Sequence, residues 1–152
     1  CIQDEIKVND LAMFDIEYIF TQLRAKSVGE VVSLILRCDT CEDDKASVSY
    51  DIDLTKLQVN IPEEHNKTIP LFGDVGVVMK YPTVEVLKQL DGLDENDFDK
   101  IFEIIALSID YIYQGDQLFY ASEQKKEELL TFVNNLSSEQ FLKIQSFFET
   151  MP

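Results

Sequence analysis

Two cysteines three positions apart, Cys38 and Cys41, form the motif with the clearest chemical potential in this sequence. A CxxC pair in a turn between strands can hold one side of a tetrahedral zinc ion through two thiolates. A complete site needs two further ligands, and the remaining candidates are Cys1, which is distant in the sequence, and His65, the sole histidine. Three interpretations stay open: free thiols, a metal site shared with another segment or subunit, and a redox pair.

The acidic residues after Cys41 favour free thiols. Glu42, Asp43 and Asp44 disfavour the thiolate that redox chemistry requires. The chain also has enough apolar residues, 45%, to fold without a metal. We therefore expect no cofactor, with zinc at Cys38 and Cys41 as the alternative.

Other polar clusters have simple structural explanations. The acidic run at residues 91–99 fits a turn at Gly92 and a helix cap at Asp94 better than a calcium loop. The sequence GDVGVV at residues 73–78 lacks the Gly-Lys-Ser/Thr ending of a phosphate loop. His65 has no serine or cysteine placed for activation, so we expect a surface histidine. With no nucleophile, base and anion-hole set, the sequence does not indicate an enzyme.

The pattern of residues 9–27 predicts an amphipathic helix. Met13, Ile16, Phe20 and Leu23 recur at helical spacing and are expected to pack inward. A second apolar face, expected to dock a partner, comprises Leu11, Phe14 and Tyr18. Tyr111 and Tyr113 are further candidates for partner binding, because tyrosines are enriched at interfaces.

Strands are predicted at residues 31–38 and 47–54, joined by the cysteine turn. Residues 47–54 alternate cleanly, so one face of this antiparallel pair is expected to be buried and the other exposed. Residues 57–61 and 75–79 predict two more strands.

The remainder is predicted to be helical, at residues 82–90, 94–113, 122–134 and 137–150, with Ile101, Phe102, Ile105 and Ile109 in the core. Ser137 and Gln140 have capping-box spacing. The predicted fold is α+β: an amino-terminal helix on a small antiparallel sheet, followed by a carboxy-proximal helical bundle. We expect one domain over residues 1–152, with a sheet portion at 1–81 and a helical portion at 82–152.

The charge of the chain restricts its partners. With 29 acidic and 13 basic side chains, the formal net charge of −16 repels nucleic acid and anionic membrane surfaces, so neither partner is expected. The odd number of cysteines favours a reducing cytoplasm.

Three segments carry a family resemblance: FDIEYIF followed by QLRAKSVGEVV within residues 14–32, GVVMKYPT at 76–83, and FFETMP at 147–152. Together they resemble the baseplate hub assembly proteins of T-even-type bacteriophages, the baseplate hub subunit family. In that family more polypeptide lies before Cys1 and after Pro152, so the sequence is interpreted as a fragment.

The resemblance implies a late-acting phage tail protein required to build the central hub of the baseplate. It would act as an assembly factor or chaperone that binds other hub and tail proteins, without a reaction or cofactor. The alternative is a permanent structural subunit of the hub, with a metal-binding CxxC module as a third interpretation. The expected location is the cytoplasm of the infected bacterium or the virion tail baseplate, and a homo-oligomer is compatible with the sequence.

Overall fold

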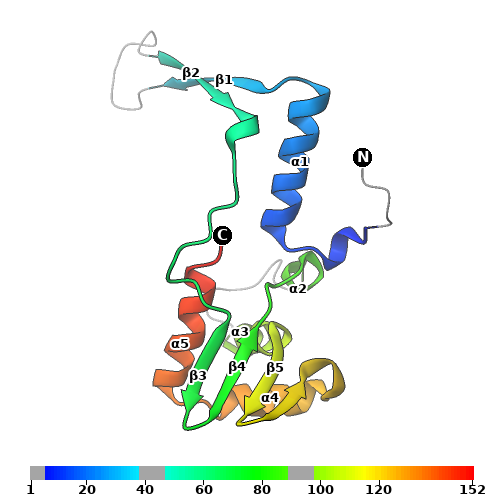
Figure 1. Cartoon of the computed structure of the whole chain (residues 1–152), viewed down its shortest axis with the longest axis vertical. Helices are drawn as coiled ribbons and strands as arrows, with labels where there is room; N and C mark the ends of the chain where they lie inside the picture. Colours follow the sequence, from blue (N-terminus) through cyan, green and yellow to red (C-terminus); the bar gives the residue numbers. More distant parts are fainter. Residues whose placement is uncertain (1–5, 38–46, 89–97) are drawn as a thin grey trace. The chain divides into compact units, whose positions relative to one another are not determined.

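The structure, a computed structural model, describes residues 6–37, 47–88 and 98–152 (Figure 1). The chain forms two compact units: unit 1 comprises residues 1–13 and 60–152, and unit 2 comprises residues 14–59. Unit 2 is thus inserted between two segments of unit 1. The expected single domain, with a sheet portion at 1–81 and a helical portion at 82–152, stays a prediction.

Unit 2 contains one long helix and one β-hairpin. Helix α1 (Met13–Ser27) starts at the last residue of the first segment of unit 1 and ends with Arg24 and Lys26 in its last turn, where cations complement the helix dipole. Strands β1 (Val31–Arg37) and β2 (Ser47–Asp53) pair antiparallel, from Val31 opposite Asp53 to Arg37 opposite Ser47. Both strands of the hairpin were correctly predicted.

The strand predicted at residues 57–61 is wrong. The chain leaves β2 through the 3₁₀ turn η2 (Leu54–Lys56), and no strand follows before residue 68. The Asp53 carboxylate accepts hydrogen bonds from the Thr55 backbone N–H at 3.0 Å and from its hydroxyl at 2.6 Å. Such side-chain bonds to the local backbone compete with strand pairing.

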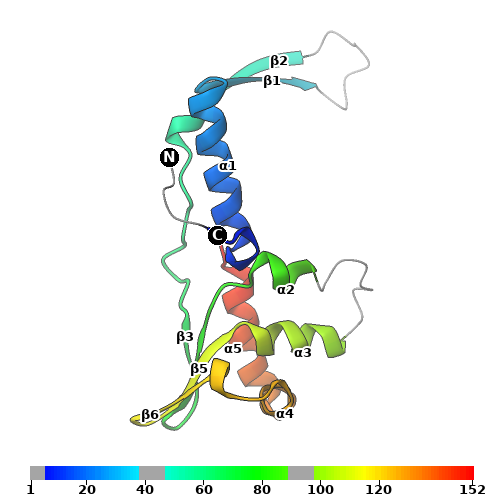
Figure 2. The same ribbon diagram turned by 90° about the vertical axis from the view of Figure 1, so that its right-hand side faces the viewer.

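Unit 1 is built on a four-stranded antiparallel sheet in the order β3-β4-β5-β6. Its strands are β3 (Thr68–Phe72), β4 (Val75–Met79), β5 (Ile109–Gln114) and β6 (Gln117–Tyr120). Three helices, α3 (Phe98–Leu107), α4 (Lys126–Asn134) and α5 (Ser138–Glu149), lie on one side of the sheet (Figure 2). The arrangement confirms the α+β class, because helices and antiparallel strands form separate layers.

The core of unit 1 lies between the sheet and its helices. Val77 and Ile109 are fully buried, as are Ile144 and Phe147 from α5. Ile105 is 3% exposed and belongs to the same cluster, as predicted. Ile101 does not, since it is 37% exposed, and Phe102 is only half-buried.

The helix predicted at residues 94–113 ends early. α3 stops at Leu107, and Ile109 begins strand β5. Residues 109–113 alternate as Ile-Asp-Tyr-Ile-Tyr, and Gly115, with φ +56°, forms the turn into β6 together with Asp116. A Gly-Asp pair between two such runs is a hairpin signal, and it outweighs the helical spacing of the isoleucines.

The last helix begins as predicted. The Ser137 hydroxyl accepts a bond from the Gln140 N–H at 3.3 Å, and the Gln140 side chain accepts one from the Ser137 N–H at 2.7 Å. This reciprocal capping box satisfies two amide donors at the helix start.

Residues 6–12 join unit 1 through α2 (Val84–Lys88). The Val84 N–H donates to the Leu11 carbonyl at 3.0 Å, Ala12 forms a β-bridge with Thr83, and the Lys88 ammonium donates to Asn9 at 2.9 Å. The two sequence segments of unit 1 are therefore held together by main-chain bonds.

Candidate docking surfaces

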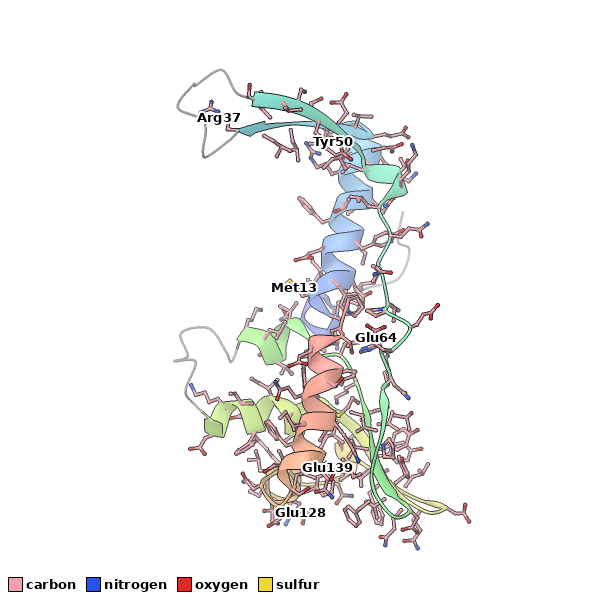
Figure 3. The ribbon with its side chains drawn as sticks, turned by 90° about the vertical axis from the view of Figure 1, so that its left-hand side faces the viewer. Met13, Arg37, Tyr50, Glu64, Glu128 and Glu139 are labelled. Atoms are coloured by element: carbon pink, nitrogen blue, oxygen red, sulfur yellow. The ribbon has the colours of Figure 1, made fainter. Side chains whose placement is uncertain are left out.

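One face of the β1–β2 hairpin carries only apolar side chains. Residues opposite each other in an antiparallel pair share a face. Exposure of this face increases away from η2: Leu34 is 40% exposed, Tyr50 58% and Val48 68%. Figure 3 shows Tyr50 on β2 and Arg37 at the end of β1. We call the six residues the apolar hairpin face: Val32 and Ile52, Leu34 and Tyr50, Leu36 and Val48.

The prediction that this hairpin buries one face is wrong for the chain by itself. Among the described residues of unit 2, only Ala25 and Leu54 are buried. A two-stranded hairpin needs a helix or further strands to cover its apolar side. The described residues of unit 2 contain too little core to supply that cover, and most of this face is exposed.

The opposite face of the hairpin is mainly polar. The Ser33 hydroxyl donates a 2.6 Å hydrogen bond to the Asp51 carboxylate on the facing strand. Ser47, Ser49 and Asp53 lie on the same side. The hairpin is thus amphipathic, with one side suited to water.

Helix α1 has an exposed apolar strip of its own. Phe20 is 68% exposed and Leu23 57%, with Ile16 one turn earlier. On the other side Ala25 is buried, and the Gln22 side chain donates to the Leu54 carbonyl at 3.4 Å. The expectation that Phe20 and Leu23 pack inward is therefore wrong; small and polar residues take that role.

The predicted docking strip on α1 is divided between the two units. Leu11 belongs to unit 1, where it is half-buried and its carbonyl is bonded to Val84. Phe14 is half-buried and Tyr18 is 40% exposed. Partner binding by these three residues stays a prediction, and the structure does not join them into one exposed strip.

Tyr111 and Tyr113 lie on the side of the four-stranded sheet that the helices leave open. Tyr113 pairs with Gly76 and Tyr111 with Val78, whereas the intervening Val77 and Ile112 pair toward the core. Tyr120 extends this face, with its ring 5.5 Å from that of Tyr111. Both predicted tyrosines are half-buried, and they form an aromatic surface consistent with their predicted role.

A third apolar surface lies on the helical side of unit 1. An open groove of about 700 Å³ runs between α3 and α5, and its walls include Ile101, Ile104, Phe141 and Leu142. Phe102 and Phe141 meet edge to face, 5.6 Å apart. Leu142, 61% exposed, stands at its rim. The groove has the apolar lining typical of a binding surface.

His65 is a structural residue, not the surface histidine that was expected. Thr150 donates its hydroxyl proton to the Ser146 carbonyl at 2.7 Å, so the hydroxyl oxygen accepts the 2.9 Å bond from His65 Nδ1. His65 Nε2 then accepts from the Tyr81 hydroxyl at 3.0 Å. The ring also stacks on Tyr81 and contacts Phe147. This network ties the segment before β3 to the end of α5.

The cysteine motif lies outside the described residues, so Cys38 and Cys41 stay predictions. Among the residues that the structure describes, no three His, Cys, Asp or Glu side chains are grouped to hold a metal ion. In that same part of the chain, no helix is long and apolar enough to cross a membrane.

Comparison with known protein families assigns the chain to one of them. The family model described as T4 bacteriophage base plate protein matches the chain over residues 1–152. The chain belongs to this family. No curated protein and no solved structure gives a significant match. A baseplate protein is a component of phage tail construction, for which surfaces that bind other proteins are the relevant sites.

Sequence reasoning missed the exposure of the apolar hairpin face in this baseplate protein. Leu34, Leu36, Val48 and Tyr50 were expected inside the fold. The available signal was β1 itself: VVSLIL is apolar at both odd and even positions, whereas β2 alternates. A strand that is apolar on both faces needs other elements packed on both faces, and one helix can cover only one of them.

Proposed function

We propose that this baseplate protein is required for assembly of the central baseplate hub, where it acts by binding other hub and tail proteins and performs no reaction. Membership of the baseplate family supports a role in tail construction. The resemblance at residues 14–32, 76–83 and 147–152 supports the hub in particular. Hub components are the proposed partners.

The observation that carries the proposal is the apolar hairpin face. Large contiguous apolar patches on a soluble protein mark sites of interaction. Burying a side chain of the size of Leu34 or Val48 contributes about 1.5–3 kcal/mol, so this face can supply substantial binding energy. Its polar reverse side, with Ser33 bonded to Asp51, stays compatible with solvent.

The acidic charge fits an assembly role. A net charge of −16 keeps a protein with several apolar surfaces soluble and disfavours association with other acidic proteins. It also speeds the approach of basic partners, because opposite charges steer encounter. We infer that the protein is present in the host cytoplasm during infection while it engages these partners.

The second candidate is a permanent structural subunit of the hub. The same surfaces would then stay buried in the finished tail. Proteomic measurement of purified virions separates the two: an assembly factor is depleted from mature particles, whereas a subunit is retained in fixed ratio to other baseplate proteins.

The proposal is tested by one charge placed on either face of β2. Tyr50→Glu puts a carboxylate on the apolar hairpin face, and Ser49→Glu puts the same charge on the polar face of the same strand. Both positions are exposed, so both variants should fold. In infected cells, Tyr50→Glu should prevent hub formation, and hub proteins should be lost from their complex with this protein. With Ser49→Glu the hub should assemble normally. Normal hubs with Tyr50→Glu would contradict a docking role for this face.

A further inference from the structure

Strand β1 has the sequence of an interior strand, although the hairpin leaves it at an edge. Val31 and Ile35 lie on one side of it, and Val32, Leu34 and Leu36 lie on the other. Interior strands, covered on both faces and paired on both edges, read as nearly continuous apolar runs. Strand β2 alternates serine and aspartate with apolar residues, as an outer strand does.

The free edge of β1 has few of the features that protect sheet edges. Natural edges carry charges, prolines or bulges that prevent another strand from pairing. Within β1 the one charged residue is Arg37, the last of the strand, and there is no proline and no glycine. The β1–β2 register is regular throughout, whereas the β3–β4 and β4–β5 ladders of unit 1 both contain shifts.

The main-chain groups on this edge can be identified. The Leu54 N–H donates to the Glu30 carbonyl at 2.7 Å, which makes residues 30 and 54 a hydrogen-bonded pair. Bonded and non-bonded pairs alternate along an antiparallel ladder. The N–H and C=O groups of alternate residues from Val31 onward therefore point away from β2, at Val31, Ser33, Ile35 and Arg37.

We propose that this edge pairs antiparallel with the β1 edge of a second copy of the chain, about a two-fold axis at Leu34. In the register that uses the whole strand, Val31 faces the partner's Arg37 and Ser33 faces the partner's Ile35. Each of these pairs exchanges two main-chain hydrogen bonds. Leu34 lies opposite the partner's Leu34 in a non-bonded pair, where side chains approach most closely.

A second copy fits this edge because β1 is complementary to itself. An isologous contact places the same surface against itself, so every like charge near the axis would be opposed by its own image. Here Arg37 faces an apolar residue, and Asp51 and Asp53 lie on β2, away from the axis. The two hairpins become one four-stranded sheet, which passes the limit of about three strands needed for independent stability.

The dimer extends the surface on which the proposed function rests. Antiparallel pairing keeps Val32, Leu34 and Leu36 on the same side as their counterparts, so two apolar hairpin faces join into one continuous sheet face for a hub component. The dimer and the role in hub assembly can be tested separately. If the protein were a monomer and hubs still assembled, only the proposed dimer would be overturned. The net charge of −16 per chain opposes association, and salt should therefore strengthen the dimer by screening.

Cross-linking of the purified chain tests the register. In a background with Cys1, Cys38 and Cys41 replaced by serine, Leu34→Cys should form an intermolecular disulfide on oxidation, because Cβ atoms of a non-bonded pair lie about 4.5–5.5 Å apart. The matched control is Tyr50→Cys, on the same face but on the outer strand, where the two copies are about 14 Å apart, three strand spacings. Equal cross-linking at both positions would overturn the register.

Two prolines test the edge. Ile35→Pro removes an N–H that faces the second copy, and Ser49→Pro removes one from the opposite edge of the hairpin at the paired position. Light scattering at micromolar concentration should give twice the 17.5 kDa mass for the wild type and Ser49→Pro, and a monomer for Ile35→Pro. A monomeric wild type, or equal behaviour of the two proline variants, would overturn the proposal.

Discussion

Tyr113 occupies the space that a side chain on Gly76 would need. The two residues face each other across β4 and β5, and a Cβ atom on Gly76 would overlap the Tyr113 hydroxyl and ring. The same Cβ would lie 2.6 Å from the Ile69 carbonyl oxygen on the other neighbouring strand. Glycine at this position lets an aromatic ring lie flat over the sheet.

Gly76→Ala should destabilise unit 1 by about 1–3 kcal/mol, because the added methyl group forces Tyr113 and β3 to move. Urea unfolding measures the change. Tyr113→Leu in the Gly76→Ala background should recover only part of the loss, since the contact with the Ile69 carbonyl stays. Full recovery would show that Tyr113 alone restricts position 76.

Ile105→Ala should cost about 2–5 kcal/mol, the range for truncating a buried aliphatic residue. Ile105 is 3% exposed within the core of unit 1. Leu142→Ala is the matched control, because Leu142 is 61% exposed at the rim of the groove and should change stability by less than about 0.5 kcal/mol. A cost below about 1 kcal/mol for Ile105→Ala would place α3 on a docking face.

His65→Phe separates hydrogen bonding from ring packing. Phenylalanine keeps contact with Tyr81 and Phe147 but loses the bonds to Tyr81 and Thr150, so unfolding free energy should fall by about 1–2 kcal/mol. His65→Ala should cost more, since it also removes the ring. If His65→Phe matched the wild type in chemical denaturation, the hydrogen bonds would contribute nothing net.

Asp53 should titrate below its ordinary pKa of 3.8. The Thr55 hydroxyl bond is the largest cause of the lowered pKa, followed by Lys56 and the Thr55 backbone N–H. Because the folded pKa is depressed, the η2 turn is stabilised above pH 3.8 and loses that contribution as pH falls through the folded pKa. NMR titration of the carboxyl carbon measures it, and Thr55→Val should raise the pKa. An unchanged pKa in that variant would assign the shift to Lys56 and the backbone N–H of residue 55 instead.

Removal of metal should leave the protein folded. We expect free thiols at Cys38 and Cys41, so a strong chelator should not change the melting temperature. Structural zinc contributes about 10–16 kcal/mol of binding energy in small zinc domains, and its loss would be obvious in thermal denaturation. A marked drop, reversed by added zinc and absent in Cys38→Ser, would make these cysteines ligands.

Local signals in the sequence predicted the elements that depend on local chemistry. Ser137 and Gln140 cap α5 as their spacing indicated, and the alternation in β2 was sufficient to place the hairpin. The signal in residues 109–113 was ambiguous, because isoleucines at 105, 109 and 112 fit a helix while the intervening tyrosines fit a strand. The Gly115-Asp116 turn decided between them, with β4 as the partner strand.

The docking surfaces could not be predicted in the same way, because periodicity indicates which residues share a face but not which face is covered. On α1 the stripe with Phe20 and Leu23 has more apolar area than the one with Ala25, yet Ala25 is the buried residue. A face is covered only when side chains from another part of the chain pack on it, and the described part of unit 2 has few side chains that could do so. The apolar hairpin face was therefore located by the distribution of buried side chains in the structure and not by the apolar pattern of the sequence.

The insertion of unit 2 between residues 13 and 60 sets an order of events during synthesis. Residues 14–59 leave the ribosome before Thr83 and Val84, whose bonds to Ala12 and Leu11 close unit 1. Chains fold from the amino terminus as they emerge at about 5–20 residues per second. All of unit 2 has consequently been synthesised while unit 1 is still open, and neighbouring ribosomes on one message would bring two such segments near each other before either chain is finished.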